Sequence, residues 1–299
     1  MKTSKGIIRL PAEVSDLVPV ISASGGKDST ATLLAAREAD IPFRAVFADT
    51  GWEAPETYEH LDDLRRRIGP IDVVRAKRNM VEEARHRAGF PMRGGRWCTE
   101  KLKIEPLRAY HDAIEKAEGR ETINIVGVRA EESAARAALK VLEDDDEWGG
   151  YVWRPILDWT VADVIEIHKR HGVPMNPLYH AGFDRVGCMP CIFARKEEVR
   201  LMADRYPGHV AEIERLEAEL TELRAVRNAE EPGRYKHPVA TFFSGRDATG
   251  ARGIRDVIAW SRTEKGGKQI PILQPPPSGG CMRWGLCEAP PAPATEVVE

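Results

Sequence analysis

Short apolar runs alternate with amphipathic stretches along the first half of the chain. The first run leads directly into a glycine-rich turn, and a helical pattern follows that turn at once. The predicted strands cover residues 18–22, 43–48, 72–76 and 123–128, and the predicted helices cover 30–38, 55–67 and 161–171. Strands that alternate with helices indicate an α/β fold with a doubly wound, mostly parallel sheet, whose site lies at the carboxyl ends of the strands.

The pattern changes after Cys191. Apolar residues recur at three- and four-residue steps from Val210 to Leu223 inside a charged segment, which predicts a helix with one narrow apolar seam. This seam either docks on the body of the protein or pairs with another helix. The stretch 246–268 is rich in Arg, Lys and Gly and has no clear period, so it is either a solvated loop or a nucleic-acid contact. The acidic run 143–147 is predicted to lie on a solvated loop.

These patterns divide the chain into three parts. Residues 1–186 are predicted to form a nucleotide-binding domain, and 187–288 a largely helical C-terminal extension that contains cysteines. The Pro/Ala-rich tail at 289–299 is predicted to be disordered.

Composition narrows the class of protein only a little. With 42% hydrophobic residues among 299, the chain has ample material for a buried core. A formal net charge of −3 gives no global reason to expect nucleic acid or an anionic membrane. We find neither an apolar signal core nor a run of about 18 apolar residues, so we expect a cytoplasmic protein without a membrane span. In a reducing cytosol the five cysteines are metal ligands or reactive thiols rather than disulfides.

The strongest chemical signal is the sequence Ser-Gly-Gly-Lys-Asp-Ser at 24–29, between a strand and a helix. Glycines without Cβ atoms let consecutive backbone N–H groups face a phosphate, and the amino terminus of the following helix favours anions. The order Lys-Asp-Ser differs from the Walker A pattern. We therefore predict a PP-loop, a loop that binds the pyrophosphate of ATP, with Asp28 as a candidate Mg²⁺ ligand. The alternative is a plain glycine turn that caps a helix.

The chain resembles the phosphoadenylyl-sulfate and adenylyl-sulfate reductase family of the PP-loop superfamily. Besides the loop, the similar segments are Asp-Thr-Gly at 49–51, Gly-Val-Arg at 127–129, the stretches 153–163 and 173–179, and Gly-Cys-Met-Pro-Cys at 187–191. The loop is intact here, whereas sulfonucleotide reductases usually carry a degraded one, and the Glu-Cys-Gly-Leu/Ile-His tail of the reductases is missing. These two departures favour ATP, and they favour the branch that includes the PP-loop protein of DNA phosphorothioation and the tRNA thiolation enzymes.

The loop and the resemblance together define the predicted nucleotide site. The residues expected to bind the nucleotide are Ser22, Ser24, Gly25, Gly26, Lys27, Asp28, Ser29, Thr30, Phe47, Asp49, Thr50, Gly127 and Arg129. The residues expected to act in catalysis are Lys27, Asp28, Arg129 and Cys287.

The cysteines allow two metal assignments. Cys188 and Cys191 have the spacing of a metal knuckle. Cys98 lies in a segment that resembles the iron–sulfur segment of adenylyl-sulfate reductases, although Thr99 stands where that family has a second cysteine. The first assignment is a [4Fe–4S] cluster on Cys98, Cys188, Cys191 and Cys281, with Cys287 as the alternative fourth ligand. The second gives the last four cysteines to Zn²⁺ and leaves Cys98 reactive. Ordinary buried cysteines are the third reading.

Two groups of polar residues carry a weaker signal. His168 and His180 are either acid–base groups or ordinary packed or solvated residues. Lys101, Lys103 and Arg108 either steady an anion near Cys98 or are surface charges.

The leading functional hypothesis is an enzyme that cleaves ATP to AMP and pyrophosphate and supports sulfur transfer to an adenylated acceptor. We expect ATP, Mg²⁺ and the cluster as cofactors. We expect a sulfur donor such as a cysteine desulfurase as a partner, and DNA or RNA as a candidate acceptor within a modification complex. One alternative is a sulfonucleotide reductase that forms sulfite. Another is a nucleotide-sensing subunit of a larger complex, without turnover.

Overall fold

The computed structural model describes residues 7–243 and 253–264. Six strands form one sheet in the order β3-β2-β1-β4-β6-β5. The strands are β1 (Val18–Ser22), β2 (Arg44–Asp49), β3 (Asp72–Arg75), β4 (Thr122–Val126), β5 (Leu142–Asp145) and β6 (Gly150–Trp153). All neighbours pair in parallel except β5, which is antiparallel to β6. The predicted doubly wound, mostly parallel α/β sheet is therefore confirmed.

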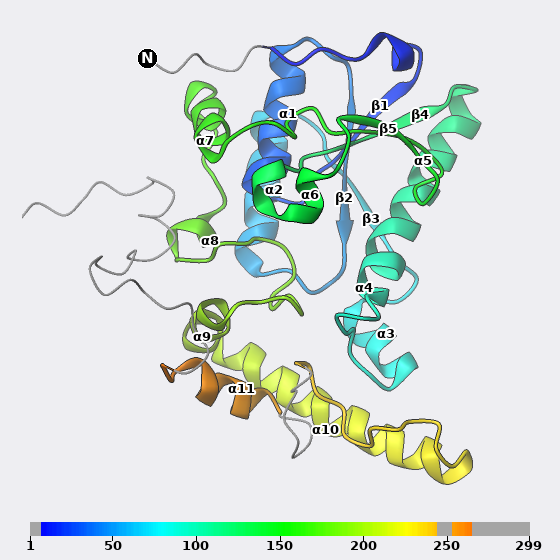
Figure 1. Ribbon diagram of the computed structural model, residues 1–299, viewed down its shortest axis with the longest axis vertical. Coiled ribbons are helices and arrows are strands. Elements are labelled where there is room, and N and C mark those ends of the chain that lie inside the picture. The colour runs from blue at the N-terminus through cyan, green and yellow to red at the C-terminus, as the bar shows by residue number, and fades with distance from the viewer. Residues whose placement is uncertain (1–6, 244–252, 265–299) are drawn as a thin grey trace, which may run out of the picture.

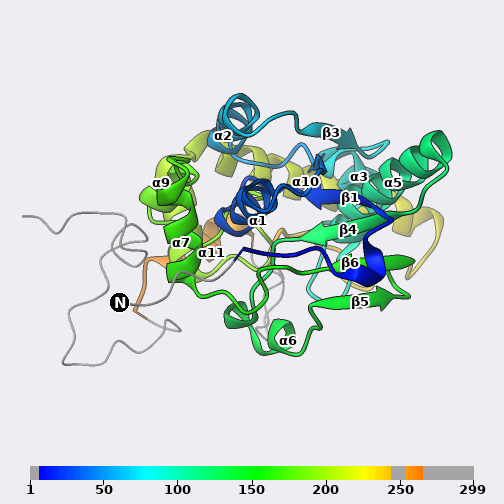
Figure 2. The same cartoon turned by 90° about the horizontal axis from the view of Figure 1, so that it is seen from above.

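Helices cover both faces of this sheet (Figure 2). The long helices are α1 (Lys27–Glu38), α2 (Pro55–Arg67), α3 (Met80–Arg87), α5 (Glu105–Glu118), α7 (Val161–Arg170), α9 (Lys196–Arg205), α10 (Pro207–Glu230) and α11 (Ile254–Ser261). The short elements are η1 (Ala12–Val14), α4 (Trp97–Thr99), η2 (Glu100–Ile104), η3 (Ala130–Glu132), α6 (Ala134–Ala137) and α8 (Pro177–His180). None of the helices in the described part is both long and apolar enough to cross a membrane.

The residues of β1 show why the sheet is covered on both sides. Ile21 belongs to a core shared with α1, α2 and α7, which contribute Leu33, Leu61 and Ile167. Val20 points to the opposite face, where it packs in a separate cluster with Ile114 of α5. Since neighbouring side chains of a strand point to opposite faces, a continuous apolar run is what a strand buried on both sides requires.

A second apolar core joins the C-terminal helices to the sheet domain. The predicted apolar seam is buried at Val210, Ile213, Leu216 and Leu220 of α10. In Figure 1 the helices α9, α10 and α11 lie beyond the end toward which the β2 arrow points. The C-terminal helices therefore cover the carboxyl edge of the sheet, where parallel α/β proteins place their sites.

Two predictions about loops were wrong in part, while a nucleic-acid contact by 246–268 stays a prediction. The acidic run 143–147 begins inside strand β5, because its alternate residues Glu143 and Asp145 bind the buried guanidinium of Arg154 at 3.0 and 3.5 Å. The stretch 246–268 contains α11, whose Ile254 is fully buried. The rest of that stretch, apart from 253–264, and the tail at 289–299 lie outside the described residues.

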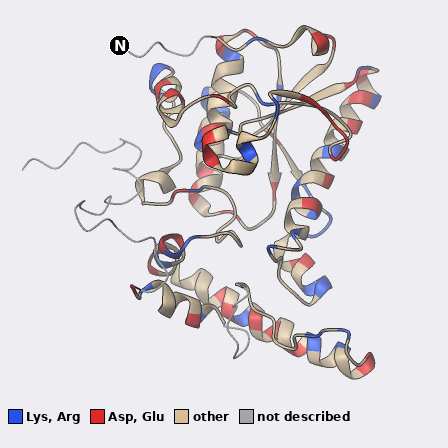
Figure 3. Ribbon diagram, in the orientation of Figure 1, with Lys and Arg blue, Asp and Glu red and all other residues tan. Residues whose placement is uncertain are grey.

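Charges of both signs are interspersed along the helices, as Figure 3 shows for α2, α5 and α10. This distribution agrees with the small formal net charge of −3. Ion pairs between neighbouring turns, such as Arg67 with Asp63 at 2.6 Å on α2, use many of these charges locally.

Candidate functional site

The glycine-rich loop connects the end of β1 to the first turn of α1. Gly25 has φ = 71°, a left-handed conformation that glycine adopts without a steric penalty. A Cβ at Gly25 would also lie 3.1 Å from the Thr57 methyl group of α2. Across the loop, the hydroxyl oxygens of Ser24 and Ser29 are 3.0 Å apart. The sequence thus forms the tight strand–loop–helix turn that we predicted, with helix α1 beginning at Lys27.

A buried group of charges lies directly behind this loop. The Asp28 carboxylate binds Lys27 Nζ at 2.8 Å and Arg129 Nε at 2.5 Å. Burial opposes ionisation of Asp28, but the two cations outweigh burial and hold its pKa below the usual value. Arg129 is only 2% exposed and also binds Glu131 at 2.8 Å. The structure therefore brings together Lys27, Asp28 and Arg129, although Arg129 comes from a loop 101 residues after Asp28.

The contacts of Asp28 bear on its predicted role as a Mg²⁺ ligand. Its Oδ2 accepts a hydrogen bond from Lys27, and its Oδ1 accepts one from Arg129. A metal ion at this carboxylate would compete with two cationic side chains for the same oxygens. The arrangement therefore fits a Mg²⁺ ligand poorly.

Gly127 explains how Arg129 reaches the loop. A Cβ at Gly127 would lie 2.6 Å from the Asp28 carbonyl oxygen and 2.7 Å from Thr32 Oγ1. No side chain fits in that space, so only glycine lets the end of β4 approach the first turn of α1 this closely.

The other predicted nucleotide contacts lie along the same sheet edge. Ser22 donates to Asn124 Oδ1 at 3.1 Å, and Phe47 is buried in the main core. Asp49 accepts hydrogen bonds from Gly51 N, Tyr58 Oη and Arg75 Nε, at 2.8 to 2.9 Å. This carboxylate therefore shapes the turn after β2, and the Phe47 ring faces the core. Their predicted contacts with a nucleotide remain predictions.

A cavity of about 320 Å³ opens beside the loop. Its cationic lining residues are Lys27, Arg129, Arg136, Arg185 and Arg195, and its acidic ones are Glu131, Glu132 and Asp184. Arg129, Arg136 and Arg195 are each paired with one of these acids, and Lys27 is paired with Asp28. The lining therefore has a small excess of positive charge, which favours an anionic molecule. Arg185 and Arg195 were not among the predicted site residues. Their position on either side of the Gly-Cys-Met-Pro-Cys segment was the available signal.

Lys103 of η2 lines one cavity together with Cys188 and Cys191. Charge on Cys188 raises the pKa of Lys103 more than burial lowers it, and Glu53, Cys191 and Cys98 act in the same direction as Cys188. Burial raises the pKa of the Cys188 and Cys98 thiols. Lys103 is therefore the member of the basic group at 101–108 that faces the thiols. Lys101 pairs with the neighbouring Glu105 instead.

The cysteine segment is attached to the turn that follows β2. Met189 N donates to the Trp52 carbonyl at 2.7 Å, and Trp52 Nε1 donates to the Pro190 carbonyl at 3.3 Å. Glu53 forms a β-bridge with Cys188 and lies 3.9 Å from its sulfur. Sequence analysis did not identify Trp52 and Glu53, although they directly follow the predicted Asp-Thr-Gly segment.

The predicted metal site is only partly represented in the structure. Within 7–243 and 253–264, no three His, Cys, Asp or Glu side chains gather closely enough to hold a metal ion. Cys281 and Cys287 lie outside the described residues. The thiol chemistry of Cys98, Cys188 and Cys191 suits either an iron–sulfur cluster or Zn²⁺. The ligand set therefore remains a prediction.

A mostly parallel sheet with a glycine-rich loop after its first strand, and a buried charged group behind that loop, defines a doubly wound α/β protein. Residues 18–194 match the phosphoadenosine phosphosulfate reductase domain family. Because this match spans more than half of the chain, the protein belongs to that family.

The chain is also similar to several individual proteins. An uncharacterized 37.8 kDa protein of Escherichia phage 186 is 35% identical over 86% of this chain and 91% of its own length. An adenosine 5′-phosphosulfate reductase of Geobacillus kaustophilus is 29% identical over 54% of this chain and 68% of its own. A Methanocaldococcus jannaschii protein is 33% identical over 63% of this chain, which spans 39% of that relative. The crystal structure of the Candida auris phosphoadenylyl-sulfate reductase has a TM-score of 0.49 and 20% identity, over 60% of this chain and 85% of that one.

Proposed function

We propose that the protein binds ATP in the loop at 24–30, cleaves it to AMP and pyrophosphate, and supports sulfur transfer to an adenylated acceptor. The observation that carries this proposal is the complete loop with Lys27, Asp28 and Arg129 buried directly behind it. Loop amides, the amino terminus of α1 and two cations can neutralise a pyrophosphate as it leaves. The cationic cavity beside the loop supports an anionic substrate as well.

The reaction requires positioning and charge stabilisation more than covalent chemistry from the protein. An acceptor oxygen attacks the α-phosphorus of ATP, and the bond from that phosphorus to the bridging oxygen breaks. Pyrophosphate leaves, and Lys27 and Arg129 stabilise its charge. A sulfur nucleophile then bonds to the acceptor atom that carried the oxygen, and AMP departs with that oxygen.

Cysteines at the same edge of the sheet suit the second stage. In this proposal Cys98, Cys188, Cys191 and Cys281, or Cys287 in place of Cys281, hold a [4Fe–4S] cluster, with Zn²⁺ as the alternative. A bound cluster would supply sulfur or redox chemistry, and Cys287 would act as the catalytic thiol if it is not a ligand. A cysteine desulfurase is the proposed sulfur donor and DNA or RNA the proposed acceptor, as in DNA phosphorothioation.

The first test is the fate of ATP. Protein purified without air is incubated with Mg²⁺ and α-labelled ATP, alone and with DNA or RNA, and products are separated by chromatography. We expect AMP and pyrophosphate, and Lys27→Ala should abolish their formation. Lys77→Ala, which changes an exposed lysine, is the matched control. Release of ADP and phosphate would contradict the proposal, and ATP binding without turnover would favour a nucleotide-sensing subunit.

A second candidate function is reduction of adenylyl sulfate or its 3′-phosphorylated form to sulfite. The observation that favours it is the similarity to proteins named adenosine 5′-phosphosulfate reductase. Here a thiol attacks the sulfur of the sulfonucleotide, AMP or its 3′-phosphorylated form leaves, and a thiol reductant such as thioredoxin releases sulfite. Sulfite formation that is lost in Cys281→Ser or Cys287→Ser protein would establish this function. AMP release from ATP without sulfite formation would exclude it.

A further inference from the structure

Three buried side chains from one later segment of the chain hold the phosphate loop. Asn176 Nδ2 donates to the Gly25 carbonyl at 3.2 Å, and Nε2 of His168 lies 3.0 Å from the Lys27 carbonyl oxygen. The backbone N–H of Lys27 donates to the Tyr179 hydroxyl at 3.1 Å. All three side chains are at most 3% exposed. The segment from α7 to α8 therefore determines the conformation of a loop about 150 residues earlier in the chain.

Tyr179 differs from the other two because it contacts a backbone N–H of the loop, whereas they contact carbonyl oxygens. Lys27 is the first residue of α1, and the N–H groups of a first helical turn have no partner within the helix. Such groups are the ones that bind phosphate in glycine-rich loops. A Cβ at Gly26 would lie 3.3 Å from the Tyr179 oxygen, so this hydroxyl lies directly against the loop.

The hydroxyl of Tyr179 accepts one hydrogen bond and still has a proton to donate. A phenolic hydroxyl carries one donor and can accept at the same time. Within the described part of the chain, the Tyr179 hydroxyl accepts from Lys27 N and has no acceptor for its own proton. Burial raises the pKa of Tyr179, so the proton stays on the oxygen at neutral pH. Lys27 Nζ lies over the Tyr179 ring, 5.2 Å from its centre.

We propose that Tyr179 is a ligand of the bound polyphosphate, and that its hydroxyl donates to a phosphate oxygen while it accepts from the Lys27 amide. The amide polarises the hydroxyl, and this makes it a stronger donor to an anion. Asn176 and His168 act as positioning residues, since they hold the loop backbone on both sides of that amide. The inference rests on the proposed binding of ATP at the loop, and it adds a nucleotide contact from α8.

Tyr179→Phe tests this directly, because it removes the hydroxyl and keeps the ring packed in place. Affinities for pyrophosphate, ATP and AMP are measured by calorimetry on the full chain with Mg²⁺ present. Loss of one hydrogen bond to a charged group should weaken the binding of pyrophosphate and of ATP about tenfold to hundredfold. AMP, which lacks the diphosphate, should change less than about twofold. Tyr110→Phe, whose hydroxyl binds Asp72 on β3, is the matched control and should leave all three affinities unchanged.

The outcomes separate this inference from the proposed function. Wild-type protein that binds neither ATP nor pyrophosphate overturns both. Wild-type binding together with undiminished affinity in Tyr179→Phe protein overturns only the inference about Tyr179. An equal loss of affinity for AMP and for pyrophosphate in Tyr179→Phe protein also overturns the inference about Tyr179. Tyr179 would then support the loop without binding the diphosphate.

A double-mutant cycle provides a second measurement. The added methyl group of Gly26→Ala should crowd the Tyr179 oxygen and weaken pyrophosphate binding. In the double mutant Gly26→Ala/Tyr179→Phe, the loss of pyrophosphate affinity should be smaller than the product of the two single losses. The reason is that the Tyr179 oxygen, which the added methyl group would crowd, is absent. Independent effects of the two substitutions would place the hydroxyl away from the loop and contradict the proposal.

Discussion

Two buried carboxylates, one behind the glycine-rich loop and one in the C-terminal helices, are bound by different kinds of group. Asp28 and Glu217 are both 8% exposed. Asp28, behind the phosphate loop, is held by the cations Lys27 and Arg129. Glu217, on α10, is held by two backbone amides, those of Phe242 and Ile254, each at 2.8 Å.

The pKa values of these two carboxyl groups are shifted in opposite directions from their ordinary values. Burial raises the pKa of Glu217, and its two amide donors only partly offset this. The pKa of Asp28 is lowered despite burial, because two full charges face it. Glu217 therefore connects α10 to the start of α11 and to the segment at 242, which is a structural role. Asp28 instead holds two cations, Lys27 and Arg129, behind the glycine-rich loop.

The largest expected effect comes from breaking the charged group behind the loop. Arg129→Ala leaves Asp28 with one cationic partner, and removing one member of a buried ion pair costs about 3–5 kcal/mol. We expect the free energy of unfolding in urea to fall by this amount, together with a loss of ATP binding. Arg129→Lys, which keeps the charge, should recover part of the stability. A loss below about 1 kcal/mol would show that water already solvates this group.

Acid should weaken the nucleotide-binding half before the C-terminal helices. Burial lowers the pKa of His60 on α2 and of His111 on α5 to about 4, from an ordinary value of 6.5. As pH falls between these values, the unfolded chain takes up protons that the folded protein does not. Stability present above pH 6.5 is therefore lost toward pH 4, by about 3 kcal/mol for each histidine.

Urea unfolding at pH 7, 6, 5 and 4 measures this loss. His60→Gln and His111→Gln should each flatten the curve, because glutamine does not titrate. Glu217 acts in the opposite direction, since a raised folded pKa favours the folded state at low pH. Hydrogen exchange at pH 5 should accordingly increase more in α2 and α5 than in α10, and equal increases would contradict the comparison.

A smaller effect is expected at Glu217 itself. Glu217→Ala leaves two buried amides, those of Phe242 and Ile254, without a partner, at a cost of about 1–3 kcal/mol. Affinity for ATP, measured by calorimetry, should stay within about twofold of wild type, because Glu217 lies in the C-terminal helices. Glu222→Ala, an exposed change on the same helix, is the control for helix propensity. A large loss of ATP affinity in Glu217→Ala protein would show that the two halves are coupled.

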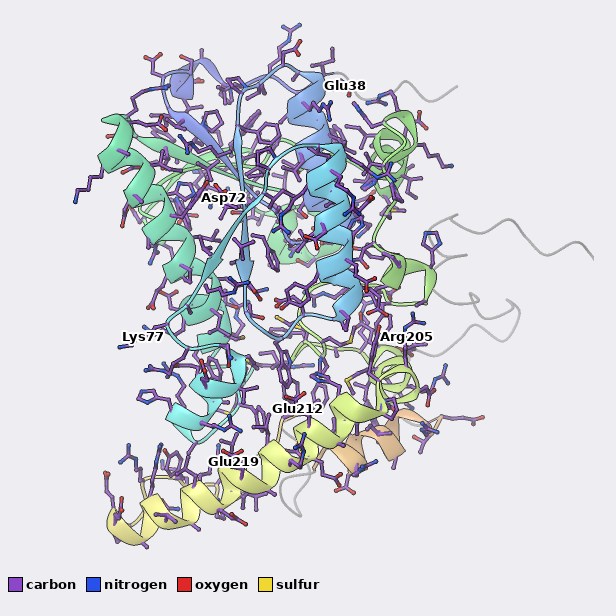
Figure 4. All side chains as sticks on the ribbon, turned by 180° about the vertical axis from the view of Figure 1, so that it is seen from behind. Glu38, Asp72, Lys77, Arg205, Glu212 and Glu219 are labelled. Atoms are coloured by element: carbon purple, nitrogen blue, oxygen red, sulfur yellow. The ribbon has the colours of Figure 1, made fainter. Side chains whose placement is uncertain are left out.

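The smallest effect is expected at the surface contact between α3 and α10. Arg85 binds Glu219 at 2.6 and 2.9 Å, and both side chains are about half exposed. Figure 4 shows Glu219 on α10. Exposed pairs of this kind contribute about 0.2–1 kcal/mol and are screened by salt. Thermal unfolding of Glu219→Gln protein should show a small loss at low ionic strength that disappears in about 1 M salt.

Local pattern was enough to predict the parts of the protein whose structure depends on neighbouring residues. The loop at 24–29, its place between β1 and α1, and the buried seam of α10 all follow from spacing within a few turns of chain. Strand β5 could not be predicted in this way. Its acidic residues predict a solvated loop when they are considered alone. Only the structure shows that they bind the buried side chain of Arg154, about ten positions later.

The residues of the candidate site fall into the same two groups: some were predicted from the sequence, and others were found only in the structure. Lys27 and Asp28 lie in one motif and were identified directly, and Arg129 was identified through its resemblance to a family segment. Tyr179 and Asn176 were part of another such segment, but nothing in their spacing indicated that they contact the loop. Glu53 and Trp52 were missed because their partners, Cys188 and Met189, come into contact only when the turn after β2 meets the cysteine segment.

The order of residues thus determined by itself a parallel α/β protein with a glycine-rich loop between its first strand and helix, because strand, helix and glycine-turn preferences act over a few residues. Only the tertiary structure decided which distant groups meet that loop. It placed Arg129 against Asp28, Tyr179 against the Lys27 amide and Lys103 among the cysteines. Such contacts form because the packed layers bring distant segments of the chain to one edge of the sheet. The periodicity of the sequence does not predict which distant segments meet there.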